Sequence, residues 1–329
     1  MTEMVADHRF LYLSRADVEK VGCSMADIVA AVERAFAEKA ARNTIMPAKH
    51  WIAPSNRRFF SAMSSALPGV GAAGCKWQSG SPDNAAQGQP YITGQYVLND
   101  LHSGLPMAVM DSTWITEMRT AAATAVAARA LIGHRPTVLG IIGCGLQARR
   151  HVEALTAVLP SLAQVRCYDI VRAAAERYRR ETMDSYPLDV RVCESGREAF
   201  DGADLVVTCG PIAPDTPRLA KASWLARGAT AVTIDYDCYW GSGELANVDR
   251  VFTDDVAQLE HTKPDGYFRG MPTTVGEICD VVAGRSKGRT AEDERIVCIN
   301  MGIALEDVAS AVVVYERARD LAVGVELAL

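Results

Sequence analysis

The pattern Gly143-x-Gly145-x-x-Ala148 is the part of this sequence whose residue types and spacing point most directly to chemistry. An apolar run from Thr137 to Ile142 precedes it and predicts a strand, and apolar residues at helical spacing follow it. In a strand-turn-helix of this kind, the first glycine permits a tight turn, the second lets a phosphate approach the backbone, and the small third residue lets the helix pack on the strand. The N–H groups of the first helical turn then face the phosphate. The sequence therefore predicts a dinucleotide-binding loop, and the alternative is a glycine turn in an ordinary α/β protein.

Asp169 adds a second feature of a dinucleotide site. It ends a predicted short strand, Gln164 to Tyr168, roughly 20 residues past the loop, where an acidic side chain can accept hydrogen bonds from the adenosine ribose hydroxyls. Its negative charge would repel a 2′-phosphate, so NAD is favoured over NADP. Two alternatives remain open, because Arg172 could accommodate that phosphate and Asp169 could instead cap a helix.

Three charged residues in other parts of the chain could supply the remaining chemistry of a small-molecule dehydrogenase. Such an enzyme needs a cation for a substrate carboxylate, an acid or electrophile to polarise a C=O or C=N bond, and a dry cleft. Arg119 could hold a carboxylate, Lys76 could polarise or protonate an imine or carbonyl, and Asp237 could give or take a proton. The structural alternatives are a surface amine for Lys76, a buried ion pair for Arg119 and a turn for Asp237.

The first part of the chain must position Lys76 and Arg119. Ser14 and Ser24 are expected to cap two packing helices, and a polar, loop-rich stretch over residues 49–62 follows. A glycine-flexed strand is expected over residues 71–77, and a hairpin over residues 94–110.

Arg119 lies near the start of the next expected helix, residues 116–131. A positive charge is unfavourable at the positive end of a helix, so we expect an anion beside it.

After the glycine loop, strands and helices alternate, which predicts a doubly wound parallel sheet. Ligands bind beyond the carboxyl ends of the strands in such sheets, so topology alone places Thr208, Asp235 and Asp237 at the cofactor cleft. A last helix, over residues 303–321, should return to the first domain. The expected strands span residues 164–168, 189–193, 203–208, 229–234, 250–253 and 296–299, and the expected helices between them span residues 171–183, 197–201 and 221–226.

Composition excludes several classes of protein. The chain of 329 residues, with 49% hydrophobic and 22% charged content, is long enough for two domains. A net charge of −6 without a dense Lys/Arg run argues against nucleic acid or an anionic membrane as a partner. The sequence has neither an apolar run of membrane-helix length nor a signal peptide, so a cytoplasmic location is expected. Nine scattered cysteines without a Cys-x-x-Cys motif, and six scattered histidines, predict reduced thiols and no metal site.

Blocks of residues along nearly the whole chain resemble the ornithine cyclodeaminase/μ-crystallin family, in the family's order. The blocks, besides Lys76 and the glycine loop, are Pro82-Asp83-Asn84, Val97-Leu98-Asn99-Asp100-x-x-Ser103-Gly104-x-Pro106-x-Ala108-x-Met110-Asp111, Ile115-Thr116-x-x-Arg119-Thr120-Ala121-Ala122, Gly284-x-x-x-Gly288-Arg289 and Gly302-Ile303-Ala304-Leu305-Glu306-Asp307.

The resemblance implies a homodimeric NAD(P)-dependent protein with two domains. Residues 1–118, completed by residues 308–329, would form a substrate-binding and dimerisation domain of α+β type, and residues 119–307 a Rossmann-type NAD-binding domain. Members of the family include ornithine cyclodeaminases, alanine dehydrogenases, ketimine and iminosuccinate reductases, and enzymes that make opine-like amino acids.

The resemblance also implies roles for individual residues. Lys76 matches the substrate-contacting lysine of the family, Arg119 its carboxylate-binding arginine, and Asp237 its catalytic acid, with Asp235 as the fallback. Asn300 and Met301 match positions that close over the substrate. The positions implied for the cofactor are Thr120, Gly143, Gly145, Leu146, Gln147, Ala148, Asp169, Thr208 and Asp235.

Two departures from the family pattern concern the substrate. The family often has an arginine for the substrate carboxylate upstream of the lysine, and this chain has Lys49 there, which offers a point charge in place of a bidentate fork. After Asp237 the chain is one residue longer than the cyclodeaminase motif, lacks its proline and lysine, and carries two aromatics, Tyr239 and Trp240. We expect these aromatics to rebuild the pocket wall that would meet the far end of a diamine, which weakens the case for ornithine.

The function expected from these observations is an NAD-dependent oxidoreductase that transfers a hydride to or from a small 2-imino or 2-amino acid. One alternative is a lyase of the ornithine cyclodeaminase type, which converts ornithine to proline and ammonia with NAD recycled. Another is a crystallin-type NAD(P)H-dependent binding protein without catalysis.

Overall fold

The computed structural model describes residues 8–55, 58–212, 217–272 and 275–329. The chain forms two compact units. The first comprises Met1–Arg119 and Ile303–Leu329, and the second comprises Thr120–Gly302.

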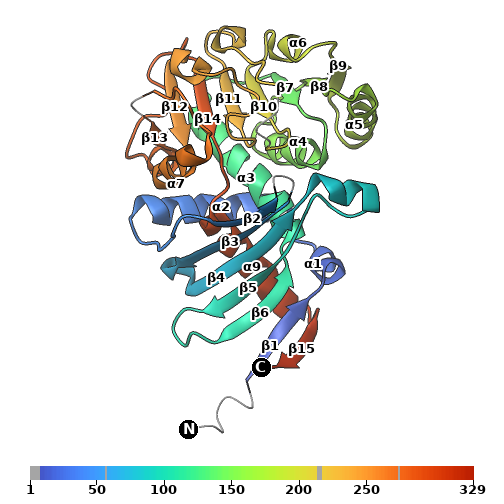
Figure 1. The fold of residues 1–329 in the computed structure, drawn as a ribbon, viewed down its shortest axis with the longest axis vertical. Helices are drawn as coiled ribbons and strands as arrows, with labels where there is room; N and C mark the ends of the chain where they lie inside the picture. Colours follow the sequence, from blue (N-terminus) through green and yellow to red (C-terminus); the bar gives the residue numbers. More distant parts are fainter. Residues whose placement is uncertain (1–7, 56–57, 213–216, 273–274) are drawn as a thin grey trace. The chain divides into compact units, whose positions relative to one another are not determined.

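The first unit is built on a mixed sheet of seven strands (Figure 1). Its strands are β1 (Arg9–Leu13), β2 (His50–Ser55), β3 (Arg58–Leu67), β4 (Ala72–Gly80), β5 (Ile92–Asp100), β6 (Pro106–Asp111) and β15 (Val325–Ala328). Their order is β15-β1-β6-β5-β4-β3-β2, and all neighbours run antiparallel except β1 and β6. Both ends of the chain therefore contribute a strand to this sheet.

Helices cover one face of the sheet. The helices of the first unit are α1 (Arg15–Val21), α2 (Met25–Ala40) and α9 (Ala304–Asp320), together with the first residues of α3 (Thr113–Leu131), which continues into the second unit. Helix α9 packs against β3, β4 and β5, and α1 and α2 pack against α9 (Figure 1). The predicted caps are confirmed, because Ser14 and Ser24 each form a capping box with the aspartate three residues later.

The prediction of a loop-rich stretch over residues 49–62 is wrong, because β2 and the first half of β3 occupy most of it. Strand β2 lies at the edge of the sheet and all six of its residues are exposed, so it lacks the alternation of buried and exposed residues that identifies a strand from sequence. Strand β3 pairs with β4 from Phe59 to Leu67, and burial alternates from Phe60 to Ser65, with Met63 buried opposite Lys76.

The second unit is the predicted doubly wound parallel sheet, and its eight strands are all parallel to their neighbours. The strands are β7 (Val138–Ile142), β8 (Gln164–Tyr168), β9 (Asp189–Val192), β10 (Leu205–Thr208), β11 (Thr230–Thr233), β12 (Arg250–Thr253), β13 (Gly276–Glu277) and β14 (Ile296–Ile299). Their order is β13-β12-β14-β11-β10-β7-β8-β9, so the strand order reverses between β7 and β10. In open α/β sheets a ligand crevice forms at such a reversal.

Helices connect these strands. Besides the rest of α3, they are α4 (Leu146–Val158), α5 (Arg172–Ser185), α6 (Gly196–Phe200), α7 (Val256–Thr262) and α8 (Ile278–Val282). Short 3-10 turns are η1 (Pro68–Val70), η2 (Pro82–Gln87), η3 (Ala222–Trp224), η4 (Glu244–Asn247) and η5 (Lys263–Asp265). The helix expected over residues 221–226 is only η3, because Leu225 already has an extended backbone. Within the described residues, no helix has both the length and the apolar character needed to cross a bilayer.

Tyr239 and Trp240 belong to the core of the second unit. Trp240 is fully buried, and its ring contacts Phe200 edge-on, with centroids 5.8 Å apart. The expectation that Trp240 lines a substrate pocket is therefore wrong, because the ring fills the interior of its own unit.

Candidate active site

The glycine loop has the geometry that the sequence predicts. Gly143 has a φ of +87°, and a Cβ atom there would lie 3.0 Å from the backbone of Cys209, so only glycine fits. Gly145 is the N-cap of α4 and has no side-chain cap, and a Cβ built on it meets no atom within 4 Å. Ala148 is fully buried between helix and strand. The first turn of α4 therefore presents backbone N–H groups to open space, which fits a pyrophosphate.

Asp169 lies directly after β8 and contacts the glycine loop. Its Oδ2 accepts a hydrogen bond from the backbone N–H of Cys144 at 2.8 Å, and its Oδ1 accepts one from Val171 at 2.8 Å. Helix α5 begins after Val171 and has no side-chain cap, so the alternative of a helix cap does not hold for Asp169. A carboxylate has about four acceptor positions, so these two bonds leave room for ribose hydroxyls. Arg172, the residue that could favour NADP, donates to Glu194 at 2.6 Å.

Thr208 and Asp235 meet at the carboxyl ends of the neighbouring strands β10 and β11. The hydroxyl of Thr208 donates to Asp235 Oδ1 at 2.7 Å, and the backbone N–H of Gly210 donates to Oδ2 at 3.1 Å. Burial raises the pKa of Asp235 to about 7, and these two bonds, which favour the ionised form, oppose that shift. Asp235 therefore joins two strand ends, and both of its oxygens are engaged.

Asp237 lies two residues further and pairs with Arg218. Arg218 Nη1 lies 2.6 Å from Asp237 Oδ2, and the Asp237 side chain is buried. Oδ1 is buried too and is one of the polar atoms of the described residues that have no hydrogen-bond partner. The carboxylate thus has one oxygen held by a cation and one available to another donor. Arg218 lies outside the helices and strands, 19 positions before Asp237, and no sequence pattern indicated its role.

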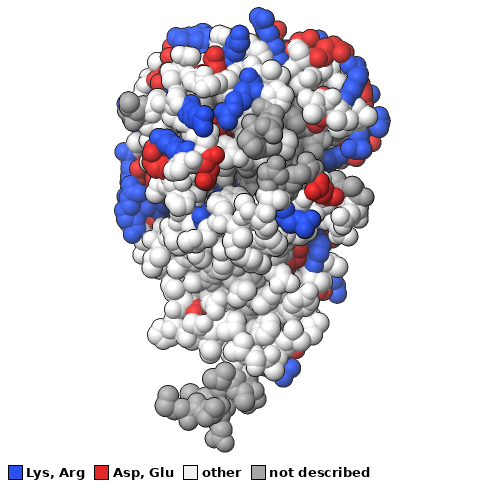
Figure 2. Space-filling model, viewed as in Figure 1, with Lys and Arg blue, Asp and Glu red and all other residues white. Residues whose placement is uncertain are grey.

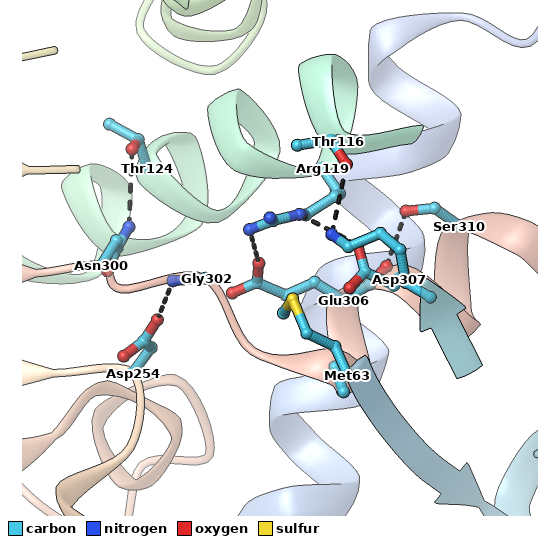
Figure 3. A network of polar contacts seen from close by, with 12 residues as sticks. Met63, Thr116, Arg119, Thr124, Asp254, Asn300, Gly302, Glu306, Asp307 and Ser310 are labelled. Carbon is cyan, nitrogen blue, oxygen red and sulfur yellow. Dashed lines mark hydrogen bonds and ion pairs between the residues drawn. The ribbon is translucent and has the colours of Figure 1, made fainter. Parts of the chain in front are cut away.

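In the first unit, Lys76 and Arg119 meet on one carboxylate. Lys76 Nζ lies 2.8 Å from Asp307 Oδ1, and Arg119 Nε lies 3.1 Å from the same oxygen. Arg119 Nη1 also contacts Glu306 Oε2 at 2.9 Å (Figure 3). Lys76 donates to the Thr116 hydroxyl at 3.2 Å. The anion expected beside Arg119 is present, and the alternative of a surface amine for Lys76 is excluded because its side chain is fully buried.

The surroundings of Lys76 lower its pKa. Burial of the side chain contributes most, and the positive charges of Arg119 and Lys49 add to the shift while Asp307 opposes it, so the pKa falls from 10.5 to about 7. Lys49 is buried as well. The effect of Arg119 and Lys49 on Lys76 shows that three cationic side chains lie near one another.

Sequence reasoning gave no role to Glu306 and Asp307, although a signal was present. Both residues are fully buried in the first turn of α9, within a run from Ile303 to Val314 whose other residues are apolar except Ser310. Adjacent acidic residues in such a run require buried cationic partners, because an unpaired buried charge is costly.

Asn300 and Met301 follow β14 and are buried. Asn300 Nδ2 donates to the hydroxyl of Thr124 on α3 at 3.4 Å, and Thr124 also contacts His151 Nε2 on α4 at 3.0 Å (Figure 3 shows the first contact). Thr120 lies one turn before Thr124 on the same helix. Thr124 and His151 were not among the residues that the sequence singled out.

Comparison with known proteins identifies the family. The model of the ornithine cyclodeaminase/mu-crystallin family matches residues 10–321. An alanine dehydrogenase of Archaeoglobus fulgidus is 32% identical over 332 residues, which cover 95% of this chain and 97% of that protein.

Two solved structures are similar over almost their whole length. An archaeal alanine dehydrogenase dimer with bound NAD is 30% identical, with a TM-score of 0.86, and covers 97% of this chain and 99% of that one. The Thermococcus litoralis Delta(1)-pyrroline-2-carboxylate reductase in complex with NADH and L-proline is 28% identical, with a TM-score of 0.85 and coverage of 96% and 99%. These similarities, with the glycine loop and the Lys76 cluster in place, show that the chain belongs to the ornithine cyclodeaminase/mu-crystallin family.

Proposed function

We propose that this protein is an NAD-dependent oxidoreductase that transfers a hydride to or from a small 2-imino or 2-amino acid, as an amino-acid dehydrogenase or imine reductase. The observation that carries the proposal is the buried cluster in which Lys76 and Arg119 share Asp307. Relatives named alanine dehydrogenase and Delta(1)-pyrroline-2-carboxylate reductase act on substrates of this class.

The cofactor is held by the second unit. The N–H groups of Leu146 and Gln147, at the open start of α4, bind the pyrophosphate, and Asp169 accepts from the adenosine ribose. Thr120 and Thr208 contribute polar contacts further along the dinucleotide. The bound nicotinamide supplies or accepts the hydride.

The substrate is held by the cations of the first unit. Arg119 and Lys49 bind its carboxylate, because cationic side chains donate charge-assisted hydrogen bonds to such a group. Lys76 polarises the C=N bond, and with a pKa of about 7 it can both give and take a proton near neutral pH. Asn300 and Met301 close over the substrate.

Asp237 handles the second proton. Its pairing with Arg218 keeps one carboxylate oxygen fixed, and its other oxygen can meet a proton donor. Asp235 is the weaker candidate because Thr208 and Gly210 occupy both of its oxygens.

The test is NADH absorbance in the presence of ammonia and a panel of 2-oxo acids, or of cyclic imines. Turnover is expected with at least one compound, and R119M should raise KM steeply while R129M, an exposed position on the same helix, should not. Folded protein that binds NADH but turns over nothing in the panel contradicts the proposal. Ammonia released from ornithine with no net NADH would instead identify the lyase.

The protein is proposed to act as a homodimer through the first unit. The face of its sheet opposite α9 exposes apolar side chains, among them Tyr12, Trp77 and Val97, and Figure 2 shows few charged residues over β4, β5 and β6. Contiguous exposed apolar surface marks interaction sites, and the archaeal alanine dehydrogenase is a dimer. Light scattering should give twice the chain mass of 35.5 kDa, and W77E should shift it toward the monomer. A monomeric wild-type protein contradicts the dimer.

The expected cytoplasmic location is a separate proposal, and cell fractionation tests it.

A further inference from the structure

A chain of hydrogen bonds inside the second unit joins the helix after the glycine loop to the end of β14. His151 Nδ1 lies 2.7 Å from the backbone oxygen of Gln147, and its Nε2 lies 3.0 Å from the Thr124 hydroxyl. Asn300 Nδ2 donates to that hydroxyl at 3.4 Å, and the thiol of Cys298 donates to Asn300 Oδ1 at 3.4 Å. His151, Thr124 and Asn300 are all buried.

The direction of each bond follows from the first one. A backbone carbonyl only accepts, so His151 Nδ1 must carry the hydrogen. Burial lowers the pKa of His151 to about 4, although the bond to Gln147 opposes this shift, so the ring is neutral at pH 7 and Nε2 is an acceptor. The hydroxyl hydrogen of Thr124 therefore points to His151, and the oxygen of Thr124 can only accept from Asn300.

The carboxamide of Asn300 consequently has one permitted orientation. Its Nδ2 must face Thr124 because that oxygen needs a donor, and its Oδ1 must face Cys298, whose S–H donates. Rotating the amide by half a turn would set two acceptors against each other at Thr124 and leave the thiol without its acceptor.

We propose that His151 is a positioning residue that fixes, through Thr124, the orientation of the Asn300 carboxamide at the end of β14. The chain of bonds begins at Gln147, whose backbone N–H is proposed to meet the pyrophosphate. The orientation of Asn300, which is proposed to contact the substrate, therefore depends on the first turn of α4. The role of Asn300 toward the substrate rests on the proposed function. The orientation of the Asn300 carboxamide does not.

The experiment compares T124V, which keeps shape and loses the hydroxyl, with T124S, which keeps the hydroxyl. T156V is the matched control, because the Thr156 hydroxyl bonds only to backbone oxygens of its own helix, at Val152 and Glu153. For the imino acid substrate, T124V should lose about tenfold in kcat/KM. Its Kd for NADH should stay within about twofold, and T124S and T156V should resemble the wild type.

A second measurement does not depend on turnover. Nitrogen NMR of His151, assigned by its loss in H151Q, should show the neutral Nδ1–H tautomer from about pH 5.5 to about pH 8.5. In T124V, but not T156V, the His151 Nε2 resonance and the Asn300 side-chain amide resonances should move.

The two measurements separate failure of this proposal from failure of the proposed function. A His151 ring that carries its hydrogen on Nε2 or titrates near its ordinary pKa overturns the positioning role, as do Asn300 resonances unchanged in T124V. Absence of turnover, with the expected NMR changes, overturns only the assigned reaction.

Discussion

Asp307 Oδ1 lies 2.8 Å from Lys76 Nζ, and neither side chain is exposed to solvent. The same oxygen lies 3.1 Å from Arg119 Nε, so one carboxylate atom serves two cations. Lys76 precedes Asp307 by 231 positions, and Arg119 precedes Glu306 by 187. Asp307 therefore determines whether the cationic side chains can remain buried at all.

Replacing Asp307 with asparagine should destabilise the protein more than a single lost hydrogen bond would. D307N leaves Lys76 and Arg119 buried without their shared counter-charge, and breaking a buried pair in this way costs about 3 to 5 kcal/mol. Urea denaturation of D307N measures this loss, with D320N, at the exposed end of α9, as the control. If D307N and D320N unfold at the same urea concentration, the pair contributes nothing to stability.

The pKa of Lys76 predicts how stability depends on pH. In the fold this pKa is lowered from 10.5 to about 7, so between these two values the unfolded chain binds a proton that the folded chain has lost. Stability contributed by this group therefore rises with pH from about 7 to about 10.5 and is constant below that window. The free energy of unfolding of the wild type should rise relative to that of K76M when both are measured at pH 7 and at pH 9.

The comparison with K76M cancels the titration of groups that do not interact with Lys76. If the free energies of unfolding of the wild type and K76M differ by the same amount at pH 7 and at pH 9, Lys76 keeps an ordinary pKa in the fold.

The glycine loop offers a test that separates cofactor binding from folding. A Cβ on Gly145 meets no neighbouring atom and its backbone suits any residue, with a φ of −83°, so G145A should fold like the wild type. The methyl group would occupy the space where phosphate approaches the backbone, and NADH affinity should fall about tenfold or more.

G143A is the contrasting variant, because its methyl would press on the backbone of Cys209 and the φ of +87° is strained for alanine. It should lower the melting temperature as well as NADH affinity. Fluorescence titration with NADH and thermal denaturation measure the two effects. Unchanged NADH affinity in G145A would place the pyrophosphate elsewhere.

The parallel sheet was predictable from sequence because its signals are local. Strands β8, β12 and β14 have the predicted bounds, since each is a short run rich in β-branched, aromatic or cysteine residues between polar or glycine-containing segments. The glycine loop is equally local. The sheet of the first unit was harder to predict, because its edge strands β2 and β15 are exposed throughout and show no alternation.

The partners of the site residues could not be predicted for a different reason. Lys76 and Asp307 are 231 positions apart, and nothing near either residue in the chain specifies the other. The charge of Arg119 at a helix start indicated that an anion was needed, but its identity depends on how α9 packs on the sheet. Arg218 and His151 were missed likewise, because their roles follow from contacts made only in the fold.

Replacement by asparagine should have different effects at Asp235 and at Asp237. The contrast identifies which of the two is the catalytic acid. Asp237 has one oxygen on Arg218 and one buried oxygen without a partner, so D237N should keep the fold and NADH affinity but lower kcat by about 10² or more. Asp235 accepts from Thr208 and Gly210 with both oxygens, and an amide there puts an N–H against a donor, so D235N should cost about 1 to 3 kcal/mol of stability. Steady-state kinetics and denaturation of both variants measure the contrast. If D235N abolishes turnover in a stable protein while D237N is active, Asp235 is the acid, and the pairing of Asp237 with Arg218 serves only to hold the loop after β11.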